Sequence, residues 1–186
     1  GAVADNKLIY EMGREVGREC KRMGIHINFA PDVDVNNNPA NPVINDRSFG
    51  EIPDEVARKG VAFYQGMKSE GVLACAKHFP GHGDVSTDSH LDLPLINKPI
   101  STFDSLEFYP FKILFKNNVG SAMVAHLNVP ALDSTGTPAS LSHKIATNWL
   151  RDSLGFDGLV FHLFAPGRRS WFGSALNGLK IIQLPA

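Results

Sequence analysis

Residues 53–77 read PDEVARKGVAFYQGMKSEGVLACAK, and this stretch contains the unit on which the predicted fold depends. Its first part, 53–69, carries small or apolar residues at helical spacing, which predicts a helix with one buried face. These residues are Val56, Gly60, Tyr64 and Met67. Gly71 follows as a stop signal, and the almost wholly apolar run 72–77 predicts a buried strand. The unit is a helix that leads directly into a strand.

The same order of helix and strand recurs along the chain. Further helices are predicted over 7–23, 104–117 with an interruption at Pro110, and 142–154 with Ser142 as its cap. Further strands are predicted over 25–30, 121–125 and 159–161. Short apolar strands that alternate with helices are typical of a parallel sheet covered by helices. The predicted fold class is therefore α/β.

Two α/β architectures fit this order, a doubly wound sheet and a (β/α)8 barrel. No glycine-rich phosphate turn follows any of the predicted strands, which favours the barrel. A complete barrel needs eight strand and helix units in about 250 residues, so the units predicted here make about half of one. We expect an incomplete (β/α)8, TIM-barrel-like fold.

Composition excludes several classes of partner. The net charge of the 186 residues is -1, which gives no electrostatic reason to expect nucleic acid or an acidic membrane surface as a partner. No apolar run is long enough for a membrane span, and no signal peptide is visible. A helical pattern starts close to residue 1, so we expect the natural amino terminus and any targeting segment to lie upstream. No cofactor is expected.

Ionisable side chains concentrate in the segment 77–90, which reads KHFPGHGDVSTDSH. In parallel α/β folds, ligands bind at the carboxyl ends of strands, and this segment directly follows the predicted strand 72–77. A proline and two glycines exclude a regular helix here, so His78 and His82 are not a helical metal-binding pair. The segment is the main candidate for a functional site.

Alternative roles stay open for individual residues of this segment. Four of them are competent zinc ligands, so a metal-dependent hydrolase remains a possible reading, although no metal site is assigned. They are His78, His82, Asp84 and His90. For His82 and Asp84, hydrogen bonds that merely stabilise the loop are an equal alternative. Asp88 lies two residues before His90, where a carboxylate can orient the imidazole and keep its pKa near neutral for proton transfer.

The segment 77–90 closely resembles the signature of the β-N-acetylglucosaminidases of glycoside hydrolase family 3, in which a Lys-His pair, Phe-Pro-Gly-His-Gly and Asp-x-His follow one another at this spacing. Further stretches that resemble the family are 28–35 (NFAPDVDV), 41–50 (NPVINDRSFG), 125–133 (AHLNVPALD) and 154–159 (LGFDGL). Residues 1–161 are therefore expected to be part of the family's N-terminal catalytic domain, and 162–186 an atypical tail.

The resemblance implies a barrel enzyme that removes terminal β-linked N-acetylglucosamine from peptidoglycan fragments or related glycoconjugates by a retaining double displacement. It also implies that His90 is the acid/base catalyst and that Asp88 assists it. Arg47, Lys77 and His78 would bind hydroxyl groups of the sugar, a role that suits charged donors. For Arg47, a contact with Asp46 or with a loop carbonyl is the alternative. Family members are cytoplasmic, periplasmic or secreted, so the compartment stays open.

The resemblance ends where the family has its nucleophile. Family members carry a nucleophilic aspartate just after the strand that matches 159–161, in a Thr/Ser-Asp pattern. This chain instead reads HLFAPGRRSW from His162, and no acidic residue occurs in 162–186. Without that aspartate the double displacement cannot proceed, so we expect the chain to be inactive, with a non-catalytic sugar-binding remnant as the alternative function. The abrupt change at His162 suggests the hypothesis of a shifted reading frame.

Overall fold

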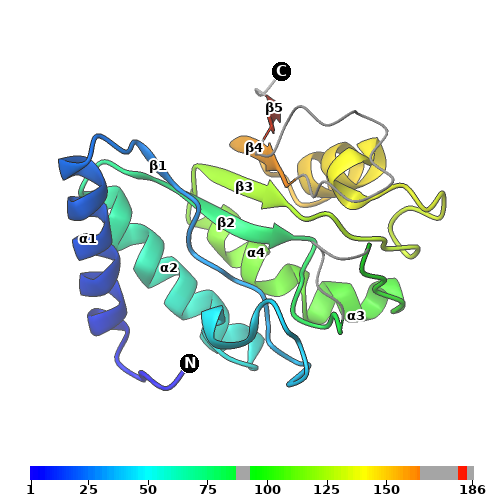
Figure 1. Ribbon diagram of the computed structural model, residues 1–186, viewed down its shortest axis with the longest axis horizontal. Helices are drawn as coiled ribbons and strands as arrows, with labels where there is room; N and C mark the ends of the chain where they lie inside the picture. Colours follow the sequence, from blue (N-terminus) through cyan, green and yellow to red (C-terminus); the bar gives the residue numbers. More distant parts are fainter. Residues whose placement is uncertain (87–92, 164–179, 184–186) are drawn as a thin grey trace.

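The computed structural model, which describes residues 1–86, 93–163 and 180–183, shows a curled sheet with helices along it (Figure 1). Four parallel strands follow one another in sequence order, and a fifth pairs antiparallel with the fourth. They are β1 (Ile27–Asn28), β2 (Leu73–Phe79), β3 (Ser121–Val124), β4 (Leu159–His162) and β5 (Lys180–Gln183). The four parallel strands form half of a barrel. The predicted α/β class and incomplete barrel are confirmed.

The helices follow the predicted order, with one correction. They are α1 (Asn6–Arg22), α2 (Pro53–Ser69), α3 (Ile100–Ser105), α4 (Phe108–Lys116) and the π-helix η3 (Lys144–Ser153), with short 3-10 turns η1 (Asn45–Arg47) and η2 (Ala139–Leu141). The helix predicted over 104–117 was expected to be interrupted at Pro110, and this position was wrong. The chain turns at Leu106 instead, and Pro110 lies inside α4. Pro110 occupies the first turn of α4, where a backbone N–H has no intrahelical acceptor to lose. Within the described part of the chain, no helix is long and apolar enough to cross a membrane.

Both faces of the sheet are apolar, as parallel sheets between two packed layers require. One face joins a large core in which side chains of α2 and α4, such as Met67 and Leu114, are fully buried. The opposite, concave face carries a smaller cluster around Met123 and Phe161. Phe29 packs edge-on against Phe161 with ring centroids 5.0 Å apart. The smaller cluster occupies the side that faces the interior in a closed barrel.

Helix α1 packs directly against α2, as the two neighbouring helices in Figure 1 show. The contact depends on glycines because the backbones approach closely. A Cβ atom at Gly13 would lie 2.1 Å from the carbonyl oxygen of Phe63, and one at Gly66 would lie 2.2 Å from that of Tyr10. These positions exclude a side chain. The packing holds α1 beside the site described next.

Candidate sugar-binding site

The chain segment after β1 runs beside the end of β2 and brings two carboxylates to the site. Lys77 N donates to Pro31 O at 3.2 Å, and Val33 N donates to Lys77 O at 2.7 Å. This parallel pairing sets Asp32 opposite Lys77. As a result, Asp32 and Asp34 lie against the residues at the carboxyl end of β2, the edge where the sequence predicted a functional site.

Asp34 is the buried centre of the site, with 1% of its surface exposed. Its Oδ2 lies 2.7 Å from Nδ1 of His78, and its Oδ1 accepts the backbone N–H of His82 at 2.7 Å. The backbone N–H of His78 lies 3.2 Å from both oxygens. Burial raises the pKa of Asp34, while the His82 charge and these donors act in the opposite direction. Because the carboxylate accepts these bonds, we assign the His78 ring proton to Nδ1.

His78 is therefore a neutral imidazole with its acceptor nitrogen directed away from Asp34. Burial lowers its pKa to about 3, and the nearby positive charges of Lys77 and Arg47 act in the same direction. Its Nε2 lies 3.5 Å from Nη2 of Arg47. The tautomer that donates from Nδ1 leaves Nε2 able to accept a hydrogen bond.

Arg47 reaches the site from the short turn η1 (Asn45–Arg47). Its Nη2 lies 3.2 Å from Oδ2 of Asp32, and its Nη1 donates to the carbonyl of Val43 at 3.2 Å. Arg47 therefore makes the contact with a loop carbonyl that was the alternative to sugar binding, and it also lies close to His78. Its carboxylate partner is Asp32, a residue to which the sequence alone assigned no role.

Asp32 is nine-tenths buried but remains close to positive charge. Burial raises its pKa to about 8, and the neighbouring Asp34 contributes to the increase, whereas His78 and Arg47 oppose it. Its Oδ1 accepts the backbone N–H of Asp34 at 3.2 Å. Asp32 therefore connects the carboxylate pair to Arg47.

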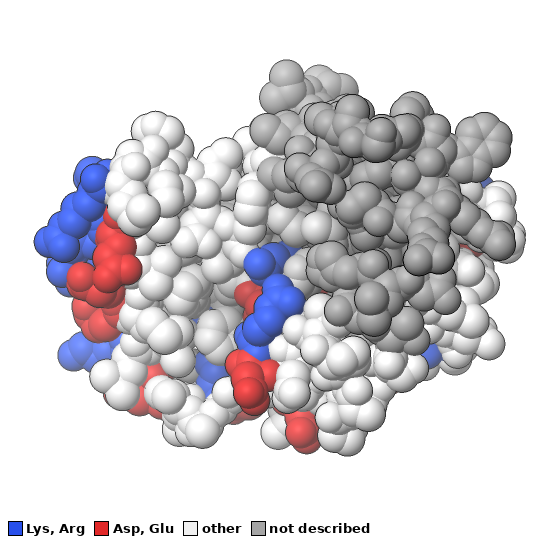
Figure 2. Space-filling view, viewed as in Figure 1, with Lys and Arg blue, Asp and Glu red and all other residues white. Residues whose placement is uncertain are grey.

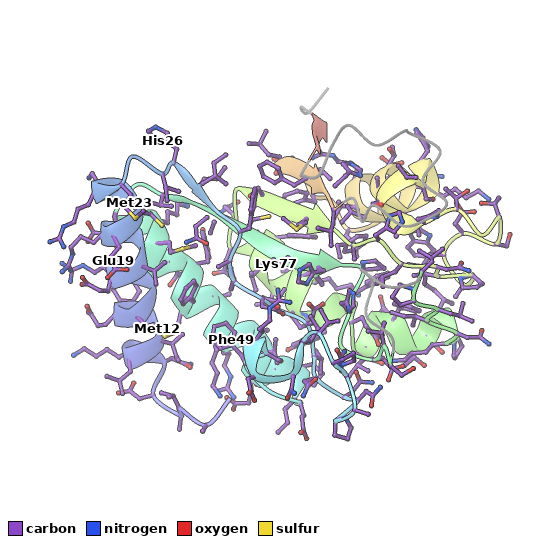
Figure 3. All side chains as sticks on the ribbon, in the orientation of Figure 1. Met12, Glu19, Met23, His26, Phe49 and Lys77 are labelled. Atoms are coloured by element: carbon purple, nitrogen blue, oxygen red, sulfur yellow. The ribbon has the colours of Figure 1, made fainter. Side chains whose placement is uncertain are left out.

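A cavity of about 410 Å³ opens beside these groups. Its polar wall includes Asp32, Arg47 and Lys77, and its apolar wall includes Met12 and Phe49. Figure 3 places Lys77 at the end of β2, between the sheet and the loop that carries Phe49. In the space-filling view, basic and acidic side chains adjoin near the middle of this face (Figure 2). Burial lowers the pKa of Lys77, and the charge of Arg47 lowers it further.

The structure thus brings together the three predicted sugar-binding residues, Arg47, Lys77 and His78. The predicted catalytic pair, Asp88 and His90, lies outside the described residues. The sequence missed Asp32 and Asp34 as site residues. Their position in the sequence could have indicated this role, because the two carboxylates closely follow the predicted strand 25–30.

His82 and Asp84 differ in their surroundings. Asp84 pairs with Lys98 at 3.0 Å and accepts a hydrogen bond from Nδ2 of Asn37 at 3.0 Å, as a loop-stabilising residue would. His82 is 1% exposed, and neither ring nitrogen has a hydrogen-bond partner within the described segments. Its backbone carbonyl accepts from Nδ2 of Asn41 at 2.8 Å.

Three of the buried groups could together hold a metal ion. The candidate ligand atoms of Asp32, Asp34 and His78 lie within 4.8 Å of one another. However, Asp34 and His78 are already joined by their hydrogen bond. A bound ion would have to replace that bond. The three clustered residues also do not include His82 and Asp84, which the sequence had suggested as zinc ligands. The geometry fits a hydrogen-bonded ligand site better than a metal centre.

Comparisons with known proteins identify the family of this chain. The family model of the glycosyl hydrolase family 3 N-terminal domain matches residues 1–162. A β-hexosaminidase A from Pseudoalteromonas piscicida is 41% identical over 156 residues, which cover 78% of this chain and 26% of that protein. The chain thus spans less than half the length of the curated relatives it matches.

Two solved structures share the fold at substantial identity. A family 3 β-N-acetylglucosaminidase from Paenibacillus sp. str. FPU-7 superposes with a TM-score of 0.83 at 43% identity, covering 84% of this chain and 30% of that one. NagZ from Neisseria gonorrhoeae, solved with N-trifluoroacetyl-D-glucosamine, gives 0.78 at 33% identity, covering 83% and 45%. The half barrel is therefore that of a known family, and the chain belongs to glycosyl hydrolase family 3, within its N-terminal domain.

Proposed function

We propose that the chain is part of a β-N-acetylhexosaminidase that removes terminal β-linked N-acetylglucosamine from peptidoglycan fragments or related glycoconjugates. The observation that carries the proposal is the meeting of Arg47, Lys77 and His78 beside one cavity at the carboxyl end of β2. The names of the relatives support the reaction type. The N-trifluoroacetyl-D-glucosamine found in one relative supports an amino-sugar ligand.

The three side chains offer what a pyranose needs. A sugar hydroxyl both donates and accepts, so a site must provide partners of both kinds. Arg47 and Lys77 are donors, whereas the neutral His78 presents Nε2 as an acceptor. Charged donors give the stronger hydrogen bonds to sugar oxygens. The cavity of about 410 Å³ has room for one hexose unit beside these groups.

For the reaction, the proposed roles follow the retaining scheme. His90, assisted by Asp88, would protonate the leaving oxygen and later activate water. The nucleophilic aspartate would follow β4, which ends at His162. Since no acidic residue occurs in 162–186, we propose that this chain binds the sugar without hydrolysing it. We also propose that 162–186 is an atypical tail produced by a shifted reading frame.

Binding and turnover can be tested together. N-acetylglucosamine is titrated into the chain by NMR, and release of nitrophenolate from 4-nitrophenyl β-N-acetylglucosaminide is followed in parallel. We expect saturable binding that is weakened by Arg47→Ala, and no release above the rate without protein. Absence of binding would refute the sugar site. Turnover by the wild-type chain that is lost in Arg47→Ala would refute the proposal that the chain is inactive for lack of a nucleophile.

The origin of the tail has its own test. The encoding DNA is sequenced again across the codon for Phe161, and the following stretch is translated in all three forward frames. A frame that reads Thr or Ser followed by Asp and Leu supports the frameshift. If no frame restores that aspartate, the tail belongs to the gene, and a sugar-binding remnant is the function to test.

A further inference from the structure

A closed ring of contacts joins four residues, two of which, Asp32 and Arg47, line the cavity. Asp32 Oδ2 lies 3.2 Å from Arg47 Nη2. The same Nη2 lies 3.5 Å from His78 Nε2, and His78 Nδ1 lies 2.7 Å from Asp34 Oδ2. The backbone N–H of Asp34 returns to Asp32 Oδ1 at 3.2 Å. Two members of the ring, Arg47 and His78, are proposed to bind sugar, and two are not.

Resting on the proposed sugar-binding function, we propose that Asp32 is a positioning residue that anchors Arg47 in the orientation needed to bind a sugar hydroxyl. Arg47 stands on a short turn, and 44% of its side chain is exposed, so little packing restrains it. An unrestrained arginine loses much rotamer freedom on binding a ligand. Above the raised pKa of Asp32, about 8, its carboxylate holds the guanidinium beforehand and reduces that loss.

The surroundings of Asp32 suit an anchor. Its side chain is 7% exposed, and the bond from the Asp34 backbone holds one carboxyl oxygen in place. The other oxygen accepts no aligned hydrogen bond from any described residue, although Arg47 approaches it within ion-pair distance. Because this oxygen is covered in the structure, it acts on the sugar through Arg47. Asp32 borders the cavity, but the carboxyl oxygen beside Arg47 is not open to the ligand.

The test is a double-mutant cycle on sugar affinity. N-acetylglucosamine is titrated into four chains: wild type, Asp32→Asn, Arg47→Ala and the double variant. Titrations are made at pH 9, because burial raises the pKa of Asp32 to about 8. We expect Asp32→Asn to weaken binding roughly tenfold when Arg47 is present, and less than about twofold when Arg47 is replaced by alanine. Asp152→Asn, which removes an exposed carboxylate on η3 away from the cavity, serves as the matched control and should change affinity less than about twofold.

Each result has a defined meaning. An equal loss in both backgrounds would show a general structural effect and overturn the inference. No loss in Asp32→Asn, while Arg47→Ala still weakens binding, would overturn the inference and leave the proposed function standing. No binding by the wild-type chain would overturn both. If Asp32→Asn does not fold, side-chain ¹⁵N relaxation of Arg47 in the wild-type chain decides, since a freely moving guanidinium contradicts an anchor.

Discussion

Asp34 Oδ2 lies 2.7 Å from Nδ1 of His78, and this contact joins residues 44 positions apart in the chain. It links the segment after β1 to the end of β2. The same carboxylate also receives the backbone N–H of His82. One buried side chain therefore sets both the conformation of the loop that follows β2 and the direction of the His78 ring.

Replacing Asp34 by Asn should destabilise the fold by about 1–3 kcal/mol, because the amide nitrogen would face N–H donors in place of an acceptor. Urea unfolding of the variant and the wild type measures the difference. The exposed Asp46→Asn serves as the control and should change the free energy of unfolding by less than about 0.5 kcal/mol. Equal stabilities for Asp34→Asn and the wild type would show that the bonds to Asp34 do not support the fold.

The pH dependence of stability should reveal Asp32. Burial raises its folded-state pKa to about 8, whereas an unfolded aspartate titrates near about 3.9. Between these values the folded state holds a proton that the unfolded state lacks, so stability falls as the pH rises through this range. The pKa of His78 is lowered to about 3, so His78 makes stability rise with pH. This effect is confined to pH values below about 6.5, where an unfolded histidine is protonated.

The window between about pH 6.5 and 8 therefore isolates Asp32 from His78. We expect urea unfolding to show a decrease in stability across this window, and Asp32→Asn to remove a large part of the decrease. A variant with the same slope as the wild type would assign the decrease to another group whose folded-state pKa is raised, such as Asp34.

Sequence reasoning gave the order of strands and helices because helical spacing and apolar runs are local signals. The family motifs also predicted Arg47, Lys77 and His78 as sugar-binding residues, and the structure places these three close together. It placed the break in the third helix at Pro110, because the sequence does not show that this proline lies in a first turn. The roles of Asp32 and Asp34 depend on pairing between distant segments, which no local pattern reports.

Lys98 should contribute to the stability of the loop that follows β2. Its Nζ pairs with Asp84, 14 residues earlier, and with the buried Glu107 at the start of α4. Lys98→Met should cost about 1–3 kcal/mol, because Glu107 loses its partner and burial already raises its pKa. Combining it with Glu107→Gln should recover much of the loss in urea unfolding. If the second change makes the loss larger, the ion pair does not explain it.

The contact between α1 and α2 can be tested with two alanine substitutions. Gly13→Ala would place a Cβ atom 2.1 Å from the Phe63 carbonyl, whereas the nearest atom at Gly17 is 3.1 Å away. We expect Gly13→Ala to cost about 3 kcal/mol, and Gly17→Ala less than about 1 kcal/mol, because helix propensity offsets its milder contact. Thermal melts of both variants measure this. A reversed order would contradict the observed crossing of the helices.

The central claim is that the neutral His78 ring takes part in sugar binding, and its ¹⁵N spectrum tests this most directly. At pH 7 we expect the ring proton on Nδ1 and an unprotonated Nε2, as its lowered pKa requires. Addition of N-acetylglucosamine should shift the Nε2 signal saturably, and Arg47→Ala should raise the concentration that this requires. An Nε2 signal that does not move at any sugar concentration would contradict the account.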